Sequence, residues 1–299
     1  MQILFEDDTI TICIKEPGIS SEDVPGGACV PAALRARWGN AQAYVGVVHR
    51  LDMGVSGVMV YARTPKAAAA LSAQVAAHTF EKEYRCVCAG APEPAVGQMH
   101  DFLFKDSRRG KVFPVKSARR GAREALLDYE TLTQAPLPAP GQGAAARAGV
   151  STREHPGPAL SAPAISAVPD GQAARAGKMA SAPGVGPRST VAAVAPAPGT
   201  VPAENPVKRP ESALFAPAAP GAAAALCRVR LHTGRTHQIR VQFASRCHPL
   251  LGDGKYGSRV KCPIALQCAR IAFDHPRTGA RMEFSAPMPG GWPWELFGL

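Results

Sequence analysis

Short apolar runs separated by turn residues dominate both ends of the chain. Residues 2–5 and 9–14 predict two strands on either side of a polar turn, and Pro17-Gly18 ends the second. Apolar runs at 44–48 and 55–62 predict two further strands. The opening of the chain therefore indicates a sheet built from short strands.

Two segments have the signals of helices instead. Pro31 to Trp38 starts with proline and is followed by Gly39, as short helices often are. Thr64 is placed as an N-cap before Pro65, and Ala67 to Ala77 predicts a helix that turns Leu71 and Val75 inward. Helices are thus few and lie between strands.

Strand patterns return beyond the second helix. Residues 83–89 predict a strand, and several more follow through residue 132. Near the other end, 226–231 and 238–244 bracket an arginine-bearing turn, 266–273 alternates, and 281–285 is expected to pair back after a hairpin turn. Many strands with few helices predict an α+β fold with a mixed, largely antiparallel central sheet and a few flanking helices.

The composition changes abruptly in the middle of the chain. Residues 135–225 consist mainly of Ala, Pro and Gly, with almost no large apolar side chains. Such a segment cannot bury enough surface to offset its ordering entropy. We therefore predict one catalytic domain in two parts, 1–134 and 226–299, separated by a disordered insertion at 135–225.

Charge narrows the class of partner. The 299 residues contain 34 Lys and Arg against 23 Asp and Glu, a net charge of +11, which favours an anionic partner such as nucleic acid. No apolar run reaches the length of a membrane span, and no signal peptide opens the chain, so we expect a cytoplasmic monomer with no membrane contact. The eight cysteines have no zinc-ligand spacing, which predicts reduced thiols and no metal site.

Two distant segments carry the candidate chemistry. One is VVHRLDMGVSGVMVYART (47–64) and the other is RVRLHTGRTHQIRVQFA (228–244). Each places a few charged residues at the end of an apolar run beside glycine, which is typical of a site rather than of a core. Together they predict that Asp52 is held ionised among several arginines.

The same segments resemble the RluA-type RNA pseudouridine synthases. His49-Arg50-Leu51-Asp52 with Ser56-Gly57 is similar to that family's first signature, and Thr233 to Arg240 (TGRTHQIR) is similar to its second. Lys82-Glu83-Tyr84 matches the family's K-x-Y strand. The opening residues, Gly252-Asp253 with Tyr256-Gly257, and His275-Pro276 follow in family order. The resemblance covers residues 1–134 and 226–299, and it places the start of the catalytic domain at Gln2, with no S4-type domain before it.

The resemblance implies roles for individual residues. Asp52 would be the catalytic carboxylate, Tyr84 the active-site tyrosine, and Arg235 the arginine that pairs with the aspartate. Arg50, His237, Arg240 and Lys82 are expected to contact RNA. Independently of the resemblance, the charge of the basic stretch from Lys105 to Lys116 suits an RNA backbone, and a solvated loop is the alternative. His49 is expected to be a hydrogen-bonded structural histidine.

The implied reaction isomerises a uridine of rRNA or tRNA to pseudouridine. It moves the bond to the sugar from N1 to C5 of the base, involves no net redox change and needs no cofactor. Whether Asp52 attacks the sugar or removes a sugar proton stays open at this point. The alternative is a non-catalytic RNA-binding protein or RNA chaperone on the same fold. A metal-dependent nuclease would need clustered ligands that the sequence lacks.

Overall fold

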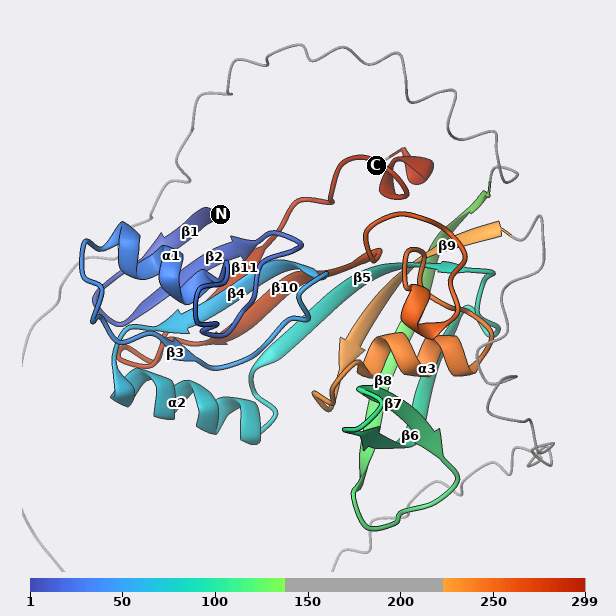
Figure 1. Ribbon diagram of the computed structural model, residues 1–299, viewed down its shortest axis with the longest axis horizontal. Coiled ribbons are helices and arrows are strands. Elements are labelled where there is room, and N and C mark those ends of the chain that lie inside the picture. The colour runs from blue at the N-terminus through green and yellow to red at the C-terminus, as the bar shows by residue number, and fades with distance from the viewer. Residues whose placement is uncertain (138–222, 299) are drawn as a thin grey trace, which may run out of the picture. The chain divides into compact units, whose positions relative to one another are not determined.

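The structure, a computed structural model, describes residues 1–137 and 223–298 (Figure 1). The first elements are β1 (Gln2–Glu6), β2 (Ile10–Lys15), α1 (Val30–Arg37), β3 (Gly46–Val47), β4 (Ser56–Ala62) and α2 (Pro65–Ala76). Next come β5 (Glu81–Ala89), β6 (Val96–Asp106), β7 (Lys111–Val115) and β8 (Ala122–Pro136). The last are β9 (Ala223–Leu231), α3 (Gln238–Ser245), the 3₁₀ turns η3 (Gly254–Tyr256) and η4 (Trp294–Phe297), β10 (Leu266–Asp274) and β11 (Arg281–Ser285).

All the described strands belong to one sheet, with the order β1-β2-β4-β10-β5-β9-β8-β6-β7. β3 adds to β4, and β11 adds to β10. The pairing of β10 with β4 is parallel, whereas β10 pairs with β5 antiparallel, so β10 joins the N-terminal strands to the rest of the sheet. The predicted α+β fold with a mixed, largely antiparallel sheet is confirmed.

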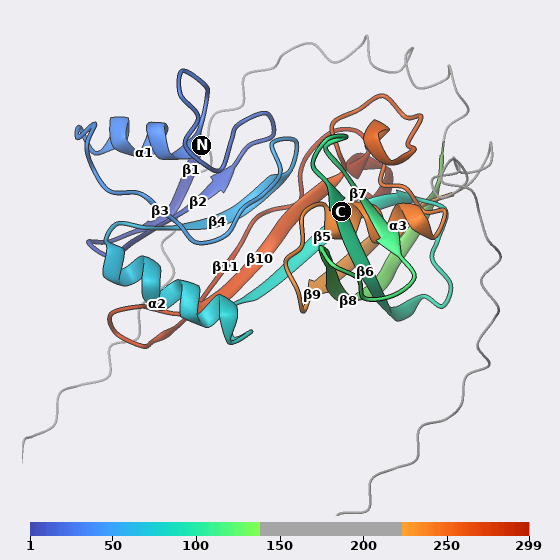
Figure 2. The same cartoon turned by 60° about the horizontal axis from the view of Figure 1, so that its bottom comes forward.

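The helices form where local signals place them. The Thr64 hydroxyl accepts a hydrogen bond from the Ala67 amide at 3.1 Å, Pro65 is the first residue of α2, and Leu71 is fully buried. This confirms the predicted cap, because a side-chain acceptor satisfies an amide that the first turn leaves unpaired. The helix α2 packs on β3, β4 and β10, whereas α3 packs on β6 and β7 (Figures 1 and 2).

The bounds of the predicted insertion need a correction. Residues 135 and 136 belong to β8 and 223–225 to β9, where Ala135 pairs with Ala224 and Gln134 with Ala225. Ala224 and Ala225 are fully buried. Backbone pairing and burial of small side chains continue the sheet past the point where large apolar residues stop. The remainder of the predicted insertion, 138–222, lies outside the described residues.

The region after β9 determines where the second motif lies. Of the two segments that bracket the arginine-bearing turn, 226–231 belongs to β9 and 238–244 to the helix α3. Residues Val241 and Ala244 of this helix pack with Leu103, Val112 and Tyr256 in a small buried cluster. This packing fixes α3, and with it the side chains that its first turn directs toward the other motif.

Candidate active site

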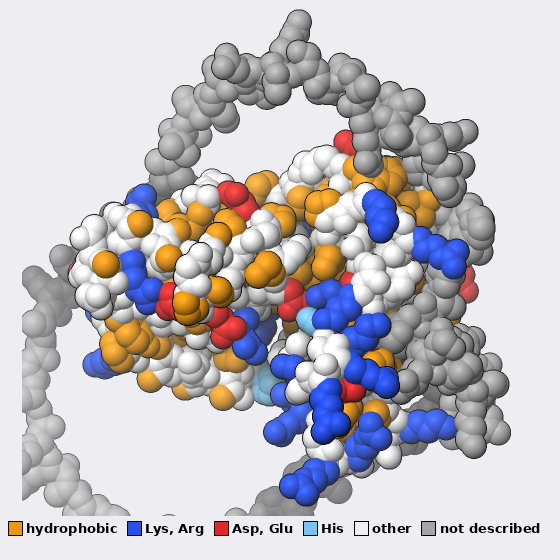
Figure 3. All heavy atoms as spheres, in the orientation of Figure 1, with side chains coloured by type: hydrophobic (Ala, Val, Ile, Leu, Met, Phe, Trp, Pro, Cys, Tyr) orange, Lys and Arg blue, Asp and Glu red, His pale blue; other side chains and the backbone are white. Residues whose placement is uncertain are grey.

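A cavity of about 1430 Å³ lies between the segment 47–53, the start of β5 and the loop 231–237. Figure 3 shows a hollow between the part of the molecule with α1 and α2 and the part with α3, with Lys and Arg side chains gathered on the α3 side. Both sequence motifs and the K-x-Y strand therefore line one cavity, as the sequence predicts.

Asp52 lies on the loop between β3 and β4, which several hydrogen bonds hold in place. The Asp52 carbonyl accepts from the Val55 amide, and the Ser21 hydroxyl donates to the carbonyl of Leu51 at 3.0 Å. The buried Lys15 ammonium donates to the carbonyl of Met53 at 3.1 Å. The carboxylate is thus presented from a fixed turn, and its side chain is partly exposed.

Arg240, and not Arg235, is the arginine that pairs with Asp52. Its Nη1 donates to Asp52 Oδ2 at 2.7 Å, while its Nε and Nη2 donate to the two carboxylate oxygens of Asp253 at 2.7 and 2.8 Å. The predicted ion pair of Asp52 with Arg235 is wrong. The reason is that 238–245 is a helix, which turns Arg240 inward while Arg235 stays on the loop before it.

The electrostatic consequence is a buried cation between two carboxylates. Burial by itself would lower the pKa of Arg240, but its hydrogen bonds and charge interactions with Asp253, and then with Asp52, hold that pKa above its ordinary value. A bidentate pair to Asp253 fixes the guanidinium plane. Asp52 Oδ2 is therefore anchored, whereas Oδ1 accepts no hydrogen bond from any residue in the described ranges.

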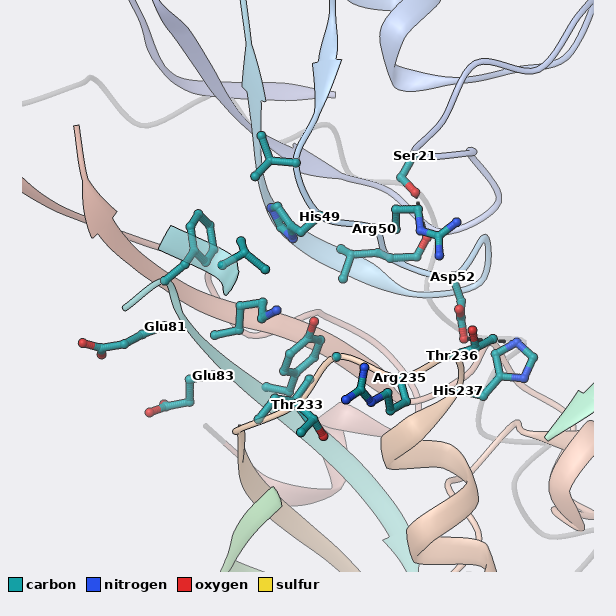
Figure 4. A pocket seen from close by; sticks show the side chains of 18 of the residues that line it. Ser21, His49, Arg50, Asp52, Glu81, Glu83, Thr233, Arg235, Thr236 and His237 are labelled. Atoms are coloured by element: carbon teal, nitrogen blue, oxygen red, sulfur yellow. Dashed lines mark hydrogen bonds and ion pairs between the residues drawn. The ribbon is translucent and has the colours of Figure 1, made fainter. Parts of the chain in front are cut away.

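His237 is the second basic group beside Asp52, as Figure 4 shows. Its Nε2 is 3.7 Å from Asp52 Oδ2, and its Nδ1 is 2.7 Å from the Tyr256 hydroxyl. That hydroxyl also accepts from the amide of Val112 at 3.1 Å. Burial lowers the pKa of His237, and Asp52 opposes this effect. The Nε2 edge of the His237 ring thus faces the carboxylate of Asp52.

The loop that carries Arg235 is fixed by Gln238. The Gln238 carbonyl oxygen accepts from the Thr233 hydroxyl at 2.8 Å and from the Arg235 amide at 3.0 Å. The side chain of Arg235 is exposed, and its Nε donates to the carbonyl of Glu124 at 2.7 Å. Arg235 therefore lies on the wall of the cavity without a carboxylate partner in the described part of the chain.

Tyr84 and Lys82 lie two residues apart on β5, and both line the cavity. Side chains at this spacing share one face of a strand. Burial raises the pKa of Tyr84 well above its usual range, and the neighbouring Cys268 adds to the effect. Its hydroxyl is therefore protonated. Burial lowers the pKa of Lys82.

The two residues that precede Asp52 in the first motif differ sharply. His49 is buried, and its Nε2 accepts from the Val60 amide at 3.1 Å, which confirms a structural histidine. Burial, with a smaller effect of Lys82, lowers the pKa of His49 to about 3. Arg50 is exposed and pairs with Glu22 at 3.1 Å on the rim of the cavity.

Sequence reasoning gave no role to Asp253 or Tyr256, although both stand in segments that follow the family's order. Their spacing from Arg240 and His237 could not show the contacts, because most of α3 and the loop after it lie between them in the sequence. None of the helices within 1–137 and 223–298 is long and apolar enough to cross a bilayer. The same residues include no group of three His, Cys, Asp or Glu side chains placed to bind a metal ion.

Comparisons with known proteins agree with this geometry. Residues 15–245 match the family described as RNA pseudouridylate synthase. An uncharacterised RNA pseudouridine synthase of Mycobacterium bovis is 25% identical over 303 residues, covering 97% of this chain and 70% of the relative. A ribosomal large subunit pseudouridine synthase D of Zymomonas mobilis is 27% identical over 308 residues, covering 97% of this chain and 69% of the relative.

Solved structures share the fold. Human RNA pseudouridylate synthase domain containing 4 aligns with a TM-score of 0.56 and 16% identity, over 96% of this chain and 88% of that one. Human RNA pseudouridylate synthase domain containing 1 aligns with a TM-score of 0.57 and 15% identity, over 96% and 82%. With the family match over most of its length and a cavity built from that family's motifs, the chain belongs to the RNA pseudouridylate synthase family, is of the RluA type, and is an isomerase that acts on RNA.

Proposed function

We propose that Asp52 is the catalytic carboxylate with which this enzyme converts specific uridines of rRNA or tRNA to pseudouridine. The observation that carries the proposal is the asymmetric environment of its two oxygens. Arg240 holds Oδ2 at 2.7 Å, and Oδ1 accepts no hydrogen bond within the described ranges. Attack on C1′ and removal of a sugar proton both use an ionised oxygen without a partner. The proposal therefore assigns the chemistry to Oδ1.

The cavity is large enough to receive an extruded nucleotide. Enzymes that act on a base move it out of the stack into a pocket, where side chains contact its face and edges. Tyr84 lines that pocket with a protonated hydroxyl. In the proposal its ring contacts the face of the uracil, and its hydroxyl takes part in proton transfer at C5.

The rim supplies the contacts with the RNA backbone. Arg50, Arg235 and Lys105 line the cavity and are exposed. Arg108 and Lys111 lie with Lys105 on the β6–β7 hairpin and are exposed or partly exposed. Cations of this kind bind phosphates and make affinity dependent on salt. We assign Arg235 to this set, because it has no contact with Asp52. We assign Arg240 to Asp52, because all three of its donor groups already bind carboxylates.

The substrate is proposed at the level of rRNA or tRNA. A relative named for the ribosomal large subunit makes 23S rRNA the first RNA to test. The predicted monomeric state and cytoplasmic location stay predictions.

The test is pseudouridine formation in uridine-labelled 23S rRNA and tRNA transcripts, with wild-type protein beside Asp52→Asn. The expected result is product with wild type and none with Asp52→Asn, at similar RNA affinity. Equal product yields from both proteins would show that the carboxylate does not act as proposed. RNA binding without product from wild type on either transcript would reject rRNA and tRNA as the substrates.

A further inference from the structure

Breaking the bond between uracil and ribose leaves a negative charge on the base. None of the roles proposed above for residues of the cavity stabilises this charge. When the N1–C1′ bond breaks, its electron pair leaves with the base, whether Asp52 attacks C1′ or removes a sugar proton. The detached uracil is then an anion, with its charge shared between N1 and the two carbonyl oxygens. A preorganised cation beside the base would stabilise this state.

Most cations that line the cavity are already neutralised. Ion pairs join Arg50 to Glu22, Arg228 to Glu130, Arg230 to Glu83, and Arg270 to Glu283. A cation paired with a carboxylate offers little net charge to a ligand. Arg235 and Lys105 have no such partner in the described part of the chain, but both are exposed, so solvent weakens their effect on a buried base.

Lys82 combines burial with an unpaired charge. It lines the cavity, is half-buried, and has neither an ion pair nor a hydrogen bond with any residue in the two described ranges. Burial lowers its pKa, and Cys268 is the one group found to act in the opposite direction. The carboxylates on either side of it in the sequence are committed elsewhere, with Glu81 beside Arg270 and Glu83 beside Arg230.

Its ammonium lies between the two motifs. A Cβ atom added to Gly234 would be 3.5 Å from Lys82 Nζ, so the amine lies beside the loop of the second motif. On the other side, its charge contributes to the lowered pKa of His49 in the first motif. Figure 4 shows His49 and Asp52 on one wall of the cavity, with Thr233 and Arg235 on the opposite wall. Tyr84 projects from the same face of β5.

We propose that Lys82 is a further catalytic residue, whose ammonium contacts the detached uracil and stabilises its negative charge until C5 bonds to the sugar. The proposal rests on the proposed function of Asp52. The N1–C1′ bond breaks with its electrons on the base, and the π electrons at C5 then form the C5–C1′ bond. If Asp52 has attacked C1′, the Asp52–C1′ bond breaks in this step and its electrons return to the carboxylate; if Asp52 has removed the proton from C2′, the same step returns that proton to C2′. C5 afterwards loses its proton and N1 gains one. Lys82 forms and breaks no covalent bond in these steps.

The direct test compares Lys82→Met, Lys82→Arg and the matched control Lys66→Met in single-turnover reactions at saturating RNA. Lys66 is an exposed lysine on α2 and does not line the cavity. We expect Lys82→Met to lose roughly 10²-fold in rate, as when one preorganised donor is removed from a site of developing charge. RNA affinity should change little, and Lys82→Arg should recover part of the rate. A Lys82→Met rate equal to wild type would overturn the proposal.

A second measurement separates charge stabilisation from packing. Fluorine at C5 withdraws electrons and stabilises the uracil anion. Cleavage of the N1–C1′ bond in RNA with 5-fluorouridine at the target should therefore depend less on the Lys82 ammonium. The rate deficit of Lys82→Met, followed as loss of 5-fluorouridine from nuclease digests, should be smaller on this RNA. An equal deficit on both RNAs would assign the loss to structure and reject the proposal.

Asp52→Asn in the same series distinguishes the two claims. If wild type and Asp52→Asn form equal product, the proposed function fails. If Asp52→Asn is inactive and Lys82→Met keeps the wild-type rate, only the role of Lys82 fails.

Discussion

Arg240 and Arg50 both pair with carboxylates close to the cavity, yet they do so in opposite surroundings. The side chain of Arg240 is 7% exposed, and it makes three hydrogen bonds of 2.7 to 2.8 Å to Asp52 and Asp253. The side chain of Arg50 is 63% exposed, and its pair with Glu22 is 3.1 Å long. In the first arrangement three nitrogens of a buried guanidinium bind two carboxylates, whereas in the second one nitrogen of an exposed guanidinium binds both oxygens of a single carboxylate.

This difference indicates a division of labour. A buried pair is strongly destabilised when one partner is removed, so its geometry is fixed before substrate arrives. An exposed pair contributes little to stability and can exchange its carboxylate for a phosphate. We infer that the interior of the site performs the chemistry, and that the rim binds RNA. The following variants test this division, from the largest expected effect to the smallest.

Replacing Asp253 by Asn should have the largest effect on stability, because it leaves Arg240 buried with one carboxylate. We expect a loss of about 3 kcal/mol in the free energy of unfolding, and a rate at least roughly tenfold lower. Denaturant melts and single-turnover kinetics measure the two quantities. The matched control is Glu22→Gln on the rim, which should change the free energy of unfolding by less than about 1 kcal/mol. Equal losses of stability in the two variants would contradict the assignment of chemistry to the interior of the site and of RNA binding to its rim.

His49 predicts how the interior responds to acid. Burial lowers its pKa from 6.5 to about 3, so the unfolded chain binds a proton below pH 6.5 that the folded protein does not accept until about pH 3. The contribution of His49 to stability is thus present above pH 6.5 and is lost as the pH falls toward 3.

The loss should amount to a few kcal/mol at most, on the order of the pKa difference converted to free energy. His49→Gln should flatten this part of the stability profile, measured by urea denaturation between pH 3 and 7. His78→Gln, which changes an exposed histidine, is the matched control. A profile of His49→Gln that keeps the wild-type slope would reject the neutral buried ring.

On the rim, the double variant Lys105→Ala with Arg108→Ala should bind RNA more weakly. The rate at which bound RNA reacts should stay unchanged. The slope of log affinity against log salt should fall by about 1.4, since each phosphate contact to a single strand contributes roughly 0.7. Filter binding at several salt concentrations measures the slope, and single-turnover kinetics at saturating RNA measures the rate. An unchanged slope would place the RNA backbone elsewhere.

The parts of the fold that could be predicted are those fixed by local signals. The Thr64 cap and Pro65 define the start of α2 to the residue, and alternation in 266–273 identifies β10. The segment 238–244 could not be assigned in the same way. Its polar residues, Gln238, Arg240 and Gln242, alternate with apolar ones and are all buried, so the segment lacks the helical period of an amphipathic helix.

The same limit explains the error in the site. The resemblance implies Arg235 as the partner of Asp52, whereas the partner is Arg240, five residues further on in α3. The contacts with Asp253 and Tyr256 depend on how the loop after α3 folds back, which no local pattern encodes. The sequence could bring the two motifs and the K-x-Y strand to one cavity, but the roles of Asp253 and Tyr256 and the pairs that the site residues form required the tertiary structure.

The most direct test of the central claim is to measure Arg240→Met and Arg235→Met side by side in single-turnover reactions at saturating RNA. If the interior of the site performs the chemistry and the rim binds RNA, Arg240→Met should lose at least roughly 10²-fold in rate and largely keep its RNA affinity. Arg235→Met should keep its rate at saturation and bind RNA more weakly. A slow Arg235→Met beside an Arg240→Met that reacts at the wild-type rate would contradict the account and restore Arg235 as the functional partner of Asp52.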